Sequence, residues 1–364
     1  MTVALPLRAI RRDDEQVIFP GPSVDDTAHG SGRRATLTTA ALVAGGTLTA
    51  LLVALLGASA AARGTGELRI PGAGAITVLR AVVFAALAVH LGELAGGRLA
   101  RTGTARSGPL RTAPGSVLGT APVTAPVTAP VTFPEPRRWA VAASLAGAAA
   151  SAGQIVLLAR VSGLDLTTVY GTADGRLLLV MANGFLLAAG CATSTRPVLA
   201  LAPLAAVVGA EALRAHPEPY TPLLGAALTV VHLTAASLWT GGLLYVLRAM
   251  WLRRGVPGGA GELLARYARH AGRLLAVLAA TGTVSALRRL PADVVLTTAY
   301  GRVLIAKLVL VAVVCALALA ARRRLGGGGD PTRPARAELA VLALVVLVSA
   351  VLTVVPDPHW VSTR

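Results

Sequence analysis

The chain has 364 residues, of which 54% are hydrophobic and only 14% are charged, and its formal net charge is +17. Together with a mean hydropathy of +0.67, this composition is typical of an integral membrane protein and excludes an ordinary soluble domain. So positive a charge suggests nucleic-acid binding in a soluble protein. Here the arginines stand at the ends of apolar runs without any nucleic-acid-binding motif. We therefore interpret them as topology determinants at the surface of a lipid bilayer.

Residues 1–35 are polar and mixed in charge, and we expect a disordered cytoplasmic tail. Nine apolar runs follow, and each is predicted to be a helix, because runs this long and apolar cannot be the alternating strands of a barrel. The first run is too long for the hydrophobic part of a signal peptide, so we expect it to be retained as a span. The runs are 36–60, 72–95, 139–159, 177–194, 197–214, 222–247, 274–287, 302–321 and 338–355.

The runs fall into groups separated by a linker. The first two spans occupy 36–96, and three more occupy 139–215. Between them lies 97–138, which contains Ala-Pro-Val-Thr three times in succession. Proline at every fourth position blocks a helix and favours an extended, solvated spacer. The remaining spans, within 222–356, form the last predicted domain.

The distribution of arginines predicts the orientation. With the N-terminus inside, 23 arginines lie in the inside segments and 9 in the outside segments. Because cytoplasmic loops are enriched in Lys and Arg, this imbalance predicts an all-α polytopic transmembrane bundle of about nine spans, N-in and C-out.

The sixth run contains the most informative segment, Val231–Gly242. His232 lies roughly 15 Å into this run, at 1.5 Å per residue of helix. An ionisable group at that depth is costly and usually faces a bundle interior, a partner or a pathway. Trp239 follows seven positions later on the same face, and the small residues Ser237 and Gly241 permit a second helix to approach closely. Two hypotheses stay open: His232 is hydrogen-bonded between helices for packing, or it is a metal ligand or proton relay.

Two other histidines are candidate metal ligands. His216 and His359 fall in predicted outside segments, Ala215–Pro219 and Pro356–Trp360, where prolines stiffen the chain. A nearby acid can hold an imidazole in one orientation, so this pair is a candidate entry site for a metal ion. Solvated loop histidines are the alternative. We expect His270 to be such a surface residue.

Other ionisable residues interrupt the apolar runs. We expect Arg80 to snorkel partly toward the end of the second run. His90 and Glu93, three positions apart on one helix face, are expected to anchor the cytoplasmic end of that run at the interface, or else to form an exit ligand pair. Glu211 and Lys307, the chain's one lysine, are candidate charge partners, the alternative being a snorkelling Lys307. Only three methionines occur, so no thioether track for Cu(I) is expected.

Three pieces of the C-terminal third stand in a distinctive order. The last of them, with its Thr…Tyr-Gly-Arg…Lys pattern, is the most specific. A helix ending Thr353–Pro356 closes the region. The pieces are Val231–Gly242, Arg266–Arg269 leading to Thr281–Ala286, and Leu296–Lys307.

Over about 228–356, these pieces resemble the membrane domain of the copper-resistance D (CopD) family. The resemblance implies an inner-membrane protein of copper uptake or handling, with the copper ion as its cargo. Trp239, Tyr300 and Lys307 stand in these pieces and are candidate supporting residues. No soluble copper-binding domain is apparent in the sequence, so an extracytoplasmic copper-binding protein is a candidate partner beside the lipid bilayer.

We therefore expect a multi-pass protein of the bacterial plasma membrane that moves or handles copper ions. His232 would lie in the bundle, with His216 and His359 at its outer entrance. No enzyme is expected, because no serine–histidine–acid set, phosphate-binding glycine loop or paired carboxylates appear in a suitable arrangement. Two alternatives remain. One is a haem-binding electron carrier, which needs two facing histidines, although His90 and His232 are predicted at different depths. The other is a non-catalytic assembly factor for a copper enzyme.

Overall fold

The computed structural model describes residues 45–46, 48–104, 138–215, 221–253 and 259–356. The chain divides into two compact units, 1–49 and 50–364, and the helices discussed below belong to the second unit, apart from the first residues of Leu48–Ala61. No strand occurs among the described residues. After Leu48–Ala61 the helices are α2 (Ala73–Thr104), α3 (Ala140–Ser162), α4 (Leu166–Gly171), α5 (Ala173–Thr193), η1 (Pro197–Ala200), α6 (Leu201–Ala215), α7 (Pro222–Leu252), α8 (Gly259–Arg289), η2 (Ala292–Val294), α9 (Ala299–Gly326) and α10 (Thr332–Leu352).

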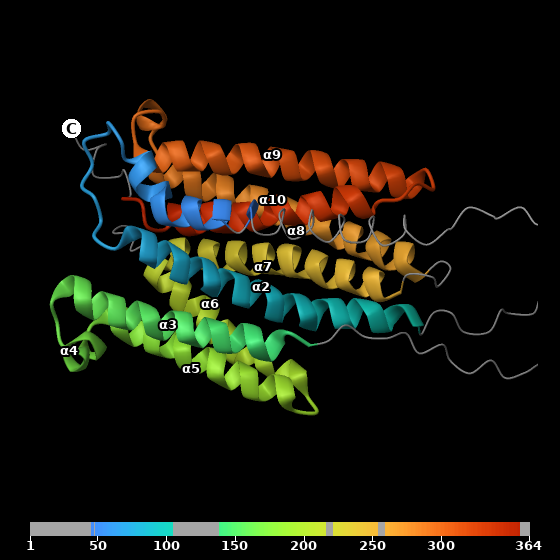
Figure 1. Ribbon diagram of the computed structural model, residues 1–364, viewed down its shortest axis with the longest axis horizontal. Coiled ribbons are helices and arrows are strands. Elements are labelled where there is room, and N and C mark those ends of the chain that lie inside the picture. The colour runs from blue at the N-terminus through green and yellow to red at the C-terminus, as the bar shows by residue number, and fades with distance from the viewer. Residues whose placement is uncertain (1–44, 47, 105–137, 216–220, 254–258, 357–364) are drawn as a thin grey trace, which may run out of the picture. The chain divides into compact units, whose positions relative to one another are not determined.

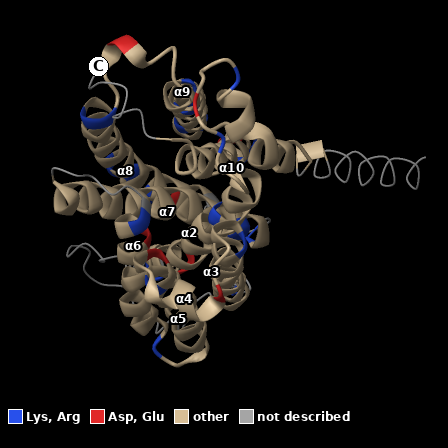
Figure 2. Ribbon diagram, turned by 90° about the vertical axis from the view of Figure 1, so that its left-hand side faces the viewer, with Lys and Arg blue, Asp and Glu red and all other residues tan. Residues whose placement is uncertain are grey.

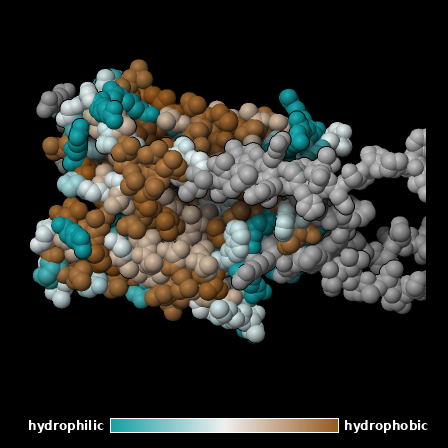
Figure 3. Space-filling view, in the orientation of Figure 1, coloured by the Kyte–Doolittle hydropathy of each residue, from teal (hydrophilic) through white to brown (hydrophobic). Residues whose placement is uncertain are grey.

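These helices form eight stretches long and apolar enough to cross a membrane, one of them made of η1 and α6 together, which confirms the predicted all-α bundle. The predicted first run, 36–60, is described only in part, as the shorter apolar helix Leu48–Ala61. Its remainder lies outside the described residues. On the face shown in Figure 3, hydrophobic atoms dominate the middle and hydrophilic patches lie toward the two ends, as expected for helices that cross lipid.

The boundaries differ most from prediction at α8. Its apolar run was predicted at 274–287, whereas the helix begins at Gly259. The first half is amphipathic: Leu263, Leu264, Tyr267 and Ala271 are buried at helical spacing, with arginines between them. A search for continuous apolar residues misses such a helix, although its periodicity of 3.6 residues is visible in the sequence. The six-residue α4, whose N-terminus is capped by Asp165, was also not predicted.

The helices lie side by side and pack in a definite order (Figure 1). In the centre, α2 contacts α3, α7 and α10, and α7 in turn contacts α8. The pair α9–α10 lies on one side of α2 and the pair α3–α5 on the other. The turn between α9 and α10 lies at the same end as the start of α8. Few charges interrupt this packing, and Figure 2 shows most of each helix as uncharged ribbon.

Glycines set the distance between α2 and α7. A Cβ added at Gly241 would lie 1.7 Å from the carbonyl oxygen of Ala88, and one at Gly96 would lie 2.3 Å from the ring of Tyr245. No side chain fits in these places, so the two backbones touch. The predicted close approach of another helix at Gly241 is confirmed, and α2 is that helix.

Candidate functional site

His232 lies against α8. Its Nδ1 is 2.9 Å from the hydroxyl oxygen of Thr281, and a Cβ added at Gly282 would lie 3.5 Å from the Cε1 atom of the ring. The ring is half-buried. It therefore occupies the contact between two membrane-crossing helices, as the sequence predicted for an ionisable group at this depth.

The hydrogen bonds of Thr281 assign the proton on this imidazole. The Thr281 hydroxyl donates its single proton to the carbonyl oxygen of Val277, at 2.8 Å. It therefore accepts a hydrogen bond from Nδ1–H of His232. The neutral ring then presents the lone pair of Nε2, and no described residue bonds to that atom. A neutral imidazole with one nitrogen oriented by a hydrogen bond is the form in which histidine binds metals.

Lys307, on α9, interacts electrostatically with His232. It makes no hydrogen bond or ion pair with any other residue that the structure describes. Tyr300, at the start of the same helix, is buried in an apolar cluster with Val303 and Leu352. Of the three predicted supporting residues, Lys307 therefore has an electrostatic interaction with His232, whereas Tyr300 belongs to a separate apolar cluster.

Trp239 is buried one helical heptad after His232, packed with Leu243 and Tyr267. Its carbonyl oxygen accepts a hydrogen bond of 2.7 Å from the Tyr267 hydroxyl, which joins α7 to α8 a second time. This hydrogen bond is made by the backbone of Trp239, and its buried indole packs in the same cluster of α7 and α8 side chains. His216 and His359 lie outside the described residues. His270 is exposed on α8, as expected.

His90 and Glu93 do not anchor the helix at the interface. His90 is 0% exposed. Its Nδ1 is 2.7 Å from the Ser144 hydroxyl on α3, and its Nε2 is buried without a hydrogen-bond partner in the described part of the chain. Glu93 accepts hydrogen bonds from the backbone N–H groups of Trp139 (2.8 Å) and Ala140 (3.0 Å). The expected anchoring is corrected, because this pair holds the start of α3 against α2.

Glu93 also forms an ion pair with Arg248 on α7, at 2.7 Å. The Arg248 guanidinium lies over the Trp139 ring, 3.7 Å from its centre. One carboxylate thus links α2, α3 and α7 at a single point. The sequence signal was the three-residue spacing of His90 and Glu93, but it did not identify their partners.

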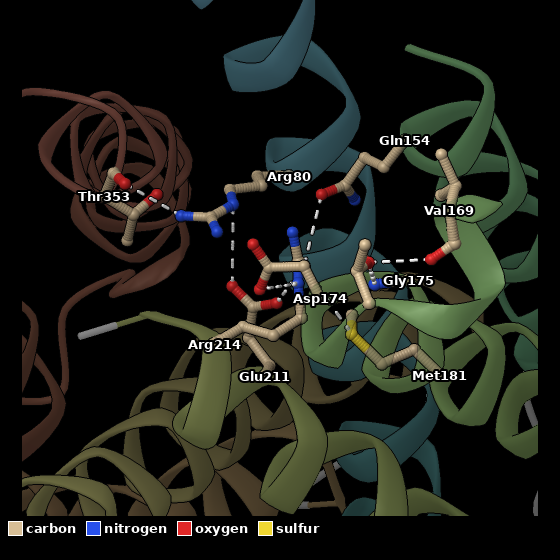
Figure 4. A network of polar contacts seen from close by, with 10 residues as sticks. Arg80, Gln154, Val169, Asp174, Gly175, Met181, Glu211, Arg214 and Thr353 are labelled. Carbon is tan, nitrogen blue, oxygen red and sulfur yellow. Dashed lines mark hydrogen bonds and ion pairs between the residues drawn. The ribbon is translucent and has the colours of Figure 1, made fainter. Parts of the chain in front are cut away.

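The predicted pairing of Glu211 with Lys307 is wrong. Glu211 is 1% exposed and pairs with two arginines instead: its Oε2 lies 3.0 Å from Nη1 of Arg214, and its Oε1 lies 3.8 Å from Nε of Arg80. Figure 4 shows Arg80 between this carboxylate and Thr353, whose carbonyl oxygen accepts a hydrogen bond of 2.8 Å. Because two guanidinium groups already neutralise this carboxylate, Lys307 is not its charge partner.

Arg80 does not snorkel. Its side chain is buried, and it joins α2 to α6 and to the end of α10. Arg214 extends the network to Gln154 on α3 (3.3 Å) and Asp174 on α5 (3.9 Å). These charged side chains connect α2, α3, α5 and α6 with the end of α10. The apolar run around Arg80 did not predict this structural role.

In the ranges that the structure describes, no group of three or more His, Cys, Asp or Glu side chains is close enough to hold a metal ion together. The site around His232 therefore offers one imidazole nitrogen rather than a closed coordination shell.

The comparisons with known proteins give one result. Residues 261–354 match the model of a protein family described as copper resistance protein D, CopD. No curated protein and no solved structure matches the chain. The matched segment includes Thr281 and Lys307, the residues that bond to and act on His232. The match and the eight apolar helices support a membrane protein of copper resistance. The likeness to the copper resistance protein D family covers residues 261–354, about a quarter of the chain.

Proposed function

We propose that this protein moves or handles copper ions across the plasma membrane of a bacterium, and that Nε2 of His232 contacts the copper ion. The observation that supports this role most directly is the 2.9 Å contact between His232 Nδ1 and Thr281 Oγ1. It fixes the ring of the one histidine on α7 and turns its free nitrogen away from Thr281. Imidazole is a good ligand for copper in both oxidation states that occur in cells.

The surroundings of His232 favour transient binding. Lys307 in its ammonium form repels a cation beside the ring, and one imidazole is a weak site by itself. An ion that must pass through a protein needs sites favourable enough to enter and weak enough to leave. His216 and His359 are proposed to receive copper at the outer entrance, from an extracytoplasmic copper-binding protein. A lipid bilayer surrounds the helices.

The experiment is copper accumulation in intact cells with and without this protein, measured by elemental analysis. Cells with the protein are expected to accumulate more copper from the same medium. His232→Ala should abolish that difference while the protein still inserts, because the proposed ligand is gone. His270→Ala is the matched control, since His270 is an exposed histidine on the adjacent helix, and it should behave as the wild type.

Equal accumulation in His232→Ala and wild-type cells would reject the role of His232. No difference between cells with and without the wild-type protein would reject copper movement itself. Co-purification of a copper enzyme without copper accumulation would favour the assembly-factor hypothesis. A Soret band in the purified protein would favour the haem hypothesis.

A further inference from the structure

A carboxyl group on α10 is buried in the bundle away from His232. Glu338 is 4% exposed and lies within the membrane-crossing helix Thr332–Leu352. No ion pair joins it to another described residue. An unpaired carboxylate inside a membrane protein is costly, and such residues commonly mark pathways for ions or protons.

Several polar groups surround this carboxyl from the neighbouring helices. The indole N–H of Trp239, on α7, interacts with the carboxyl group of Glu338. The geometry of this contact is not that of a normal hydrogen bond. Tyr267, on α8, is electrostatically coupled to it, although its hydroxyl proton is donated to the carbonyl oxygen of Trp239. On α9 the groups are Arg322 and Cys315. No charge on α2 or on the helix Leu48–Ala61, which also contact α10, acts on it within the described residues.

Arg322 attracts Glu338 from a distance without pairing with it. Its Nη2 donates a hydrogen bond of 2.5 Å to the carbonyl oxygen of Ala268, so the guanidinium is held on α8, and the side chain is exposed. A partner fixed beside the carboxylate would keep it charged permanently. A fixed charge held farther away leaves the carboxyl free to change its protonation state.

A cavity of about 20 Å³ adjoins the carboxyl. Its lining includes Glu338, Tyr267, Arg322 and Leu325. A space of this size accommodates one water molecule. Arg322 and Leu325 belong to the last turns of α9, so the cavity lies toward the end of the bundle where α9 turns into α10.

We propose that Glu338 is a proton-binding site, reached through this cavity from the α9–α10 end of the bundle. On release, the O–H bond of the carboxyl group breaks and the proton passes to a water molecule in the cavity, leaving a carboxylate that faces Trp239 and Arg322. On uptake the same steps run in reverse, so no other reactant is needed. The proton site does not depend on the cargo, whereas its coupling to copper movement rests on the proposed function.

The test is infrared difference spectroscopy of the full-length protein in lipid nanodiscs, titrated from acidic to alkaline pH. The C=O stretch of a protonated carboxyl should disappear as pH rises. The Glu338→Gln variant should lack that component. Glu262→Gln is the matched control, because Glu262 is exposed and paired with Arg266 on α8, and it should retain the component.

An identical titration in Glu338→Gln and wild-type protein would overturn the proposal. If Glu338→Gln does not fold, Glu338→Asp decides: the component should persist at a changed frequency or midpoint, and an unchanged component would again overturn it. A second measurement addresses the coupling. Copper accumulation in cells should depend on external pH in the wild type and lose this dependence in Glu338→Gln. Absence of accumulation in the wild type would count against copper movement and leave the infrared result to decide the proton site.

Discussion

Gly92 of α2 and Gly241 of α7 are packed back to back: a Cβ added at Gly92 would lie 2.2 Å from the carbonyl carbon of Gly241. This contact places the backbone of α7 directly on α2. The same helix presents His232 to α8 nine residues earlier. The position of the candidate copper ligand therefore depends on a contact that only glycine permits.

Gly241→Ala is expected to destabilise the protein. The added methyl group would lie 1.7 Å from the carbonyl oxygen of Ala88, so the two helices must separate, at a cost of about 1–3 kcal/mol or more. The measurement is the thermal unfolding midpoint of the purified protein. Gly190→Ala serves as the control, because nothing lies within 4 Å of a Cβ there, and it should be neutral or slightly stabilising. Equal midpoints for the two variants would contradict the packing argument.

Thr281→Val is expected to weaken copper binding without removing the ligand. Valine has nearly the same shape as threonine but cannot accept the hydrogen bond from His232 Nδ1, so the ring loses its orientation. Loss of such a group typically lowers metal affinity about 10- to 100-fold. Titration of the purified protein with copper against a competing chelator measures the change. Thr281→Ser should restore the affinity, and Thr283→Val, at an exposed position on the same helix, should leave it unchanged. Wild-type affinity in Thr281→Val would argue against this orientation.

Glu211→Gln is expected to lower stability strongly. It leaves the buried side chains of Arg80 and Arg214 without their shared carboxylate, and breaking a buried pair costs about 3–5 kcal/mol. Glu262→Gln removes the exposed pair with Arg266, which is worth about 0.3–0.5 kcal/mol. Denaturation of both variants under the same conditions measures the difference. Similar losses in the two variants would show that the ion pairs of Glu211 with Arg80 and Arg214 do not stabilise the bundle.

The orientation of the bundle is testable at the two ends of α9. The predicted topology places Ala292 outside and Gly326 inside, and both positions are exposed. Single cysteines at these positions, with Cys191 and Cys315 replaced by serine, should react differently with a membrane-impermeant maleimide. We expect labelling at 292 in intact cells and at 326 only after permeabilisation. The reverse pattern would invert the topology.

The helical bundle followed from the sequence because long apolar runs have only one stable form in lipid. The contact of Gly241 with α2 followed in part from the small residues beside it. The sequence did not predict which residues the charged side chains contact. From the sequence, Arg80 was interpreted as a residue near the end of an apolar run. In the structure it contacts Glu211 and Thr353 inside the bundle. Both residues lie more than a hundred positions away in the chain.

The sequence predicted where in the chain the candidate site lies, but not which side chains surround it. His232 is identifiable as an ionisable residue in an apolar run. The acceptor Thr281 begins the Thr281–Ala286 piece, but it lies on a different helix, and the sequence does not show that the two side chains meet. Glu338 was not predicted to be a buried site, because it is the first residue of its predicted run and a charged residue at that position is expected at the membrane interface. Its burial depends on the packing of α7, α8 and α9 around it, which sequence periodicity does not specify.

The central claim is that copper contacts Nε2 of His232. X-ray absorption spectroscopy of the copper-loaded, purified protein tests it most directly, because imidazole scattering around the metal is recognisable. The wild type should bind copper with an imidazole in its coordination shell, and His232→Ala should lose that imidazole while His270→Ala retains it. An unchanged imidazole contribution in His232→Ala, or copper bound without any imidazole in the wild type, would contradict the claim.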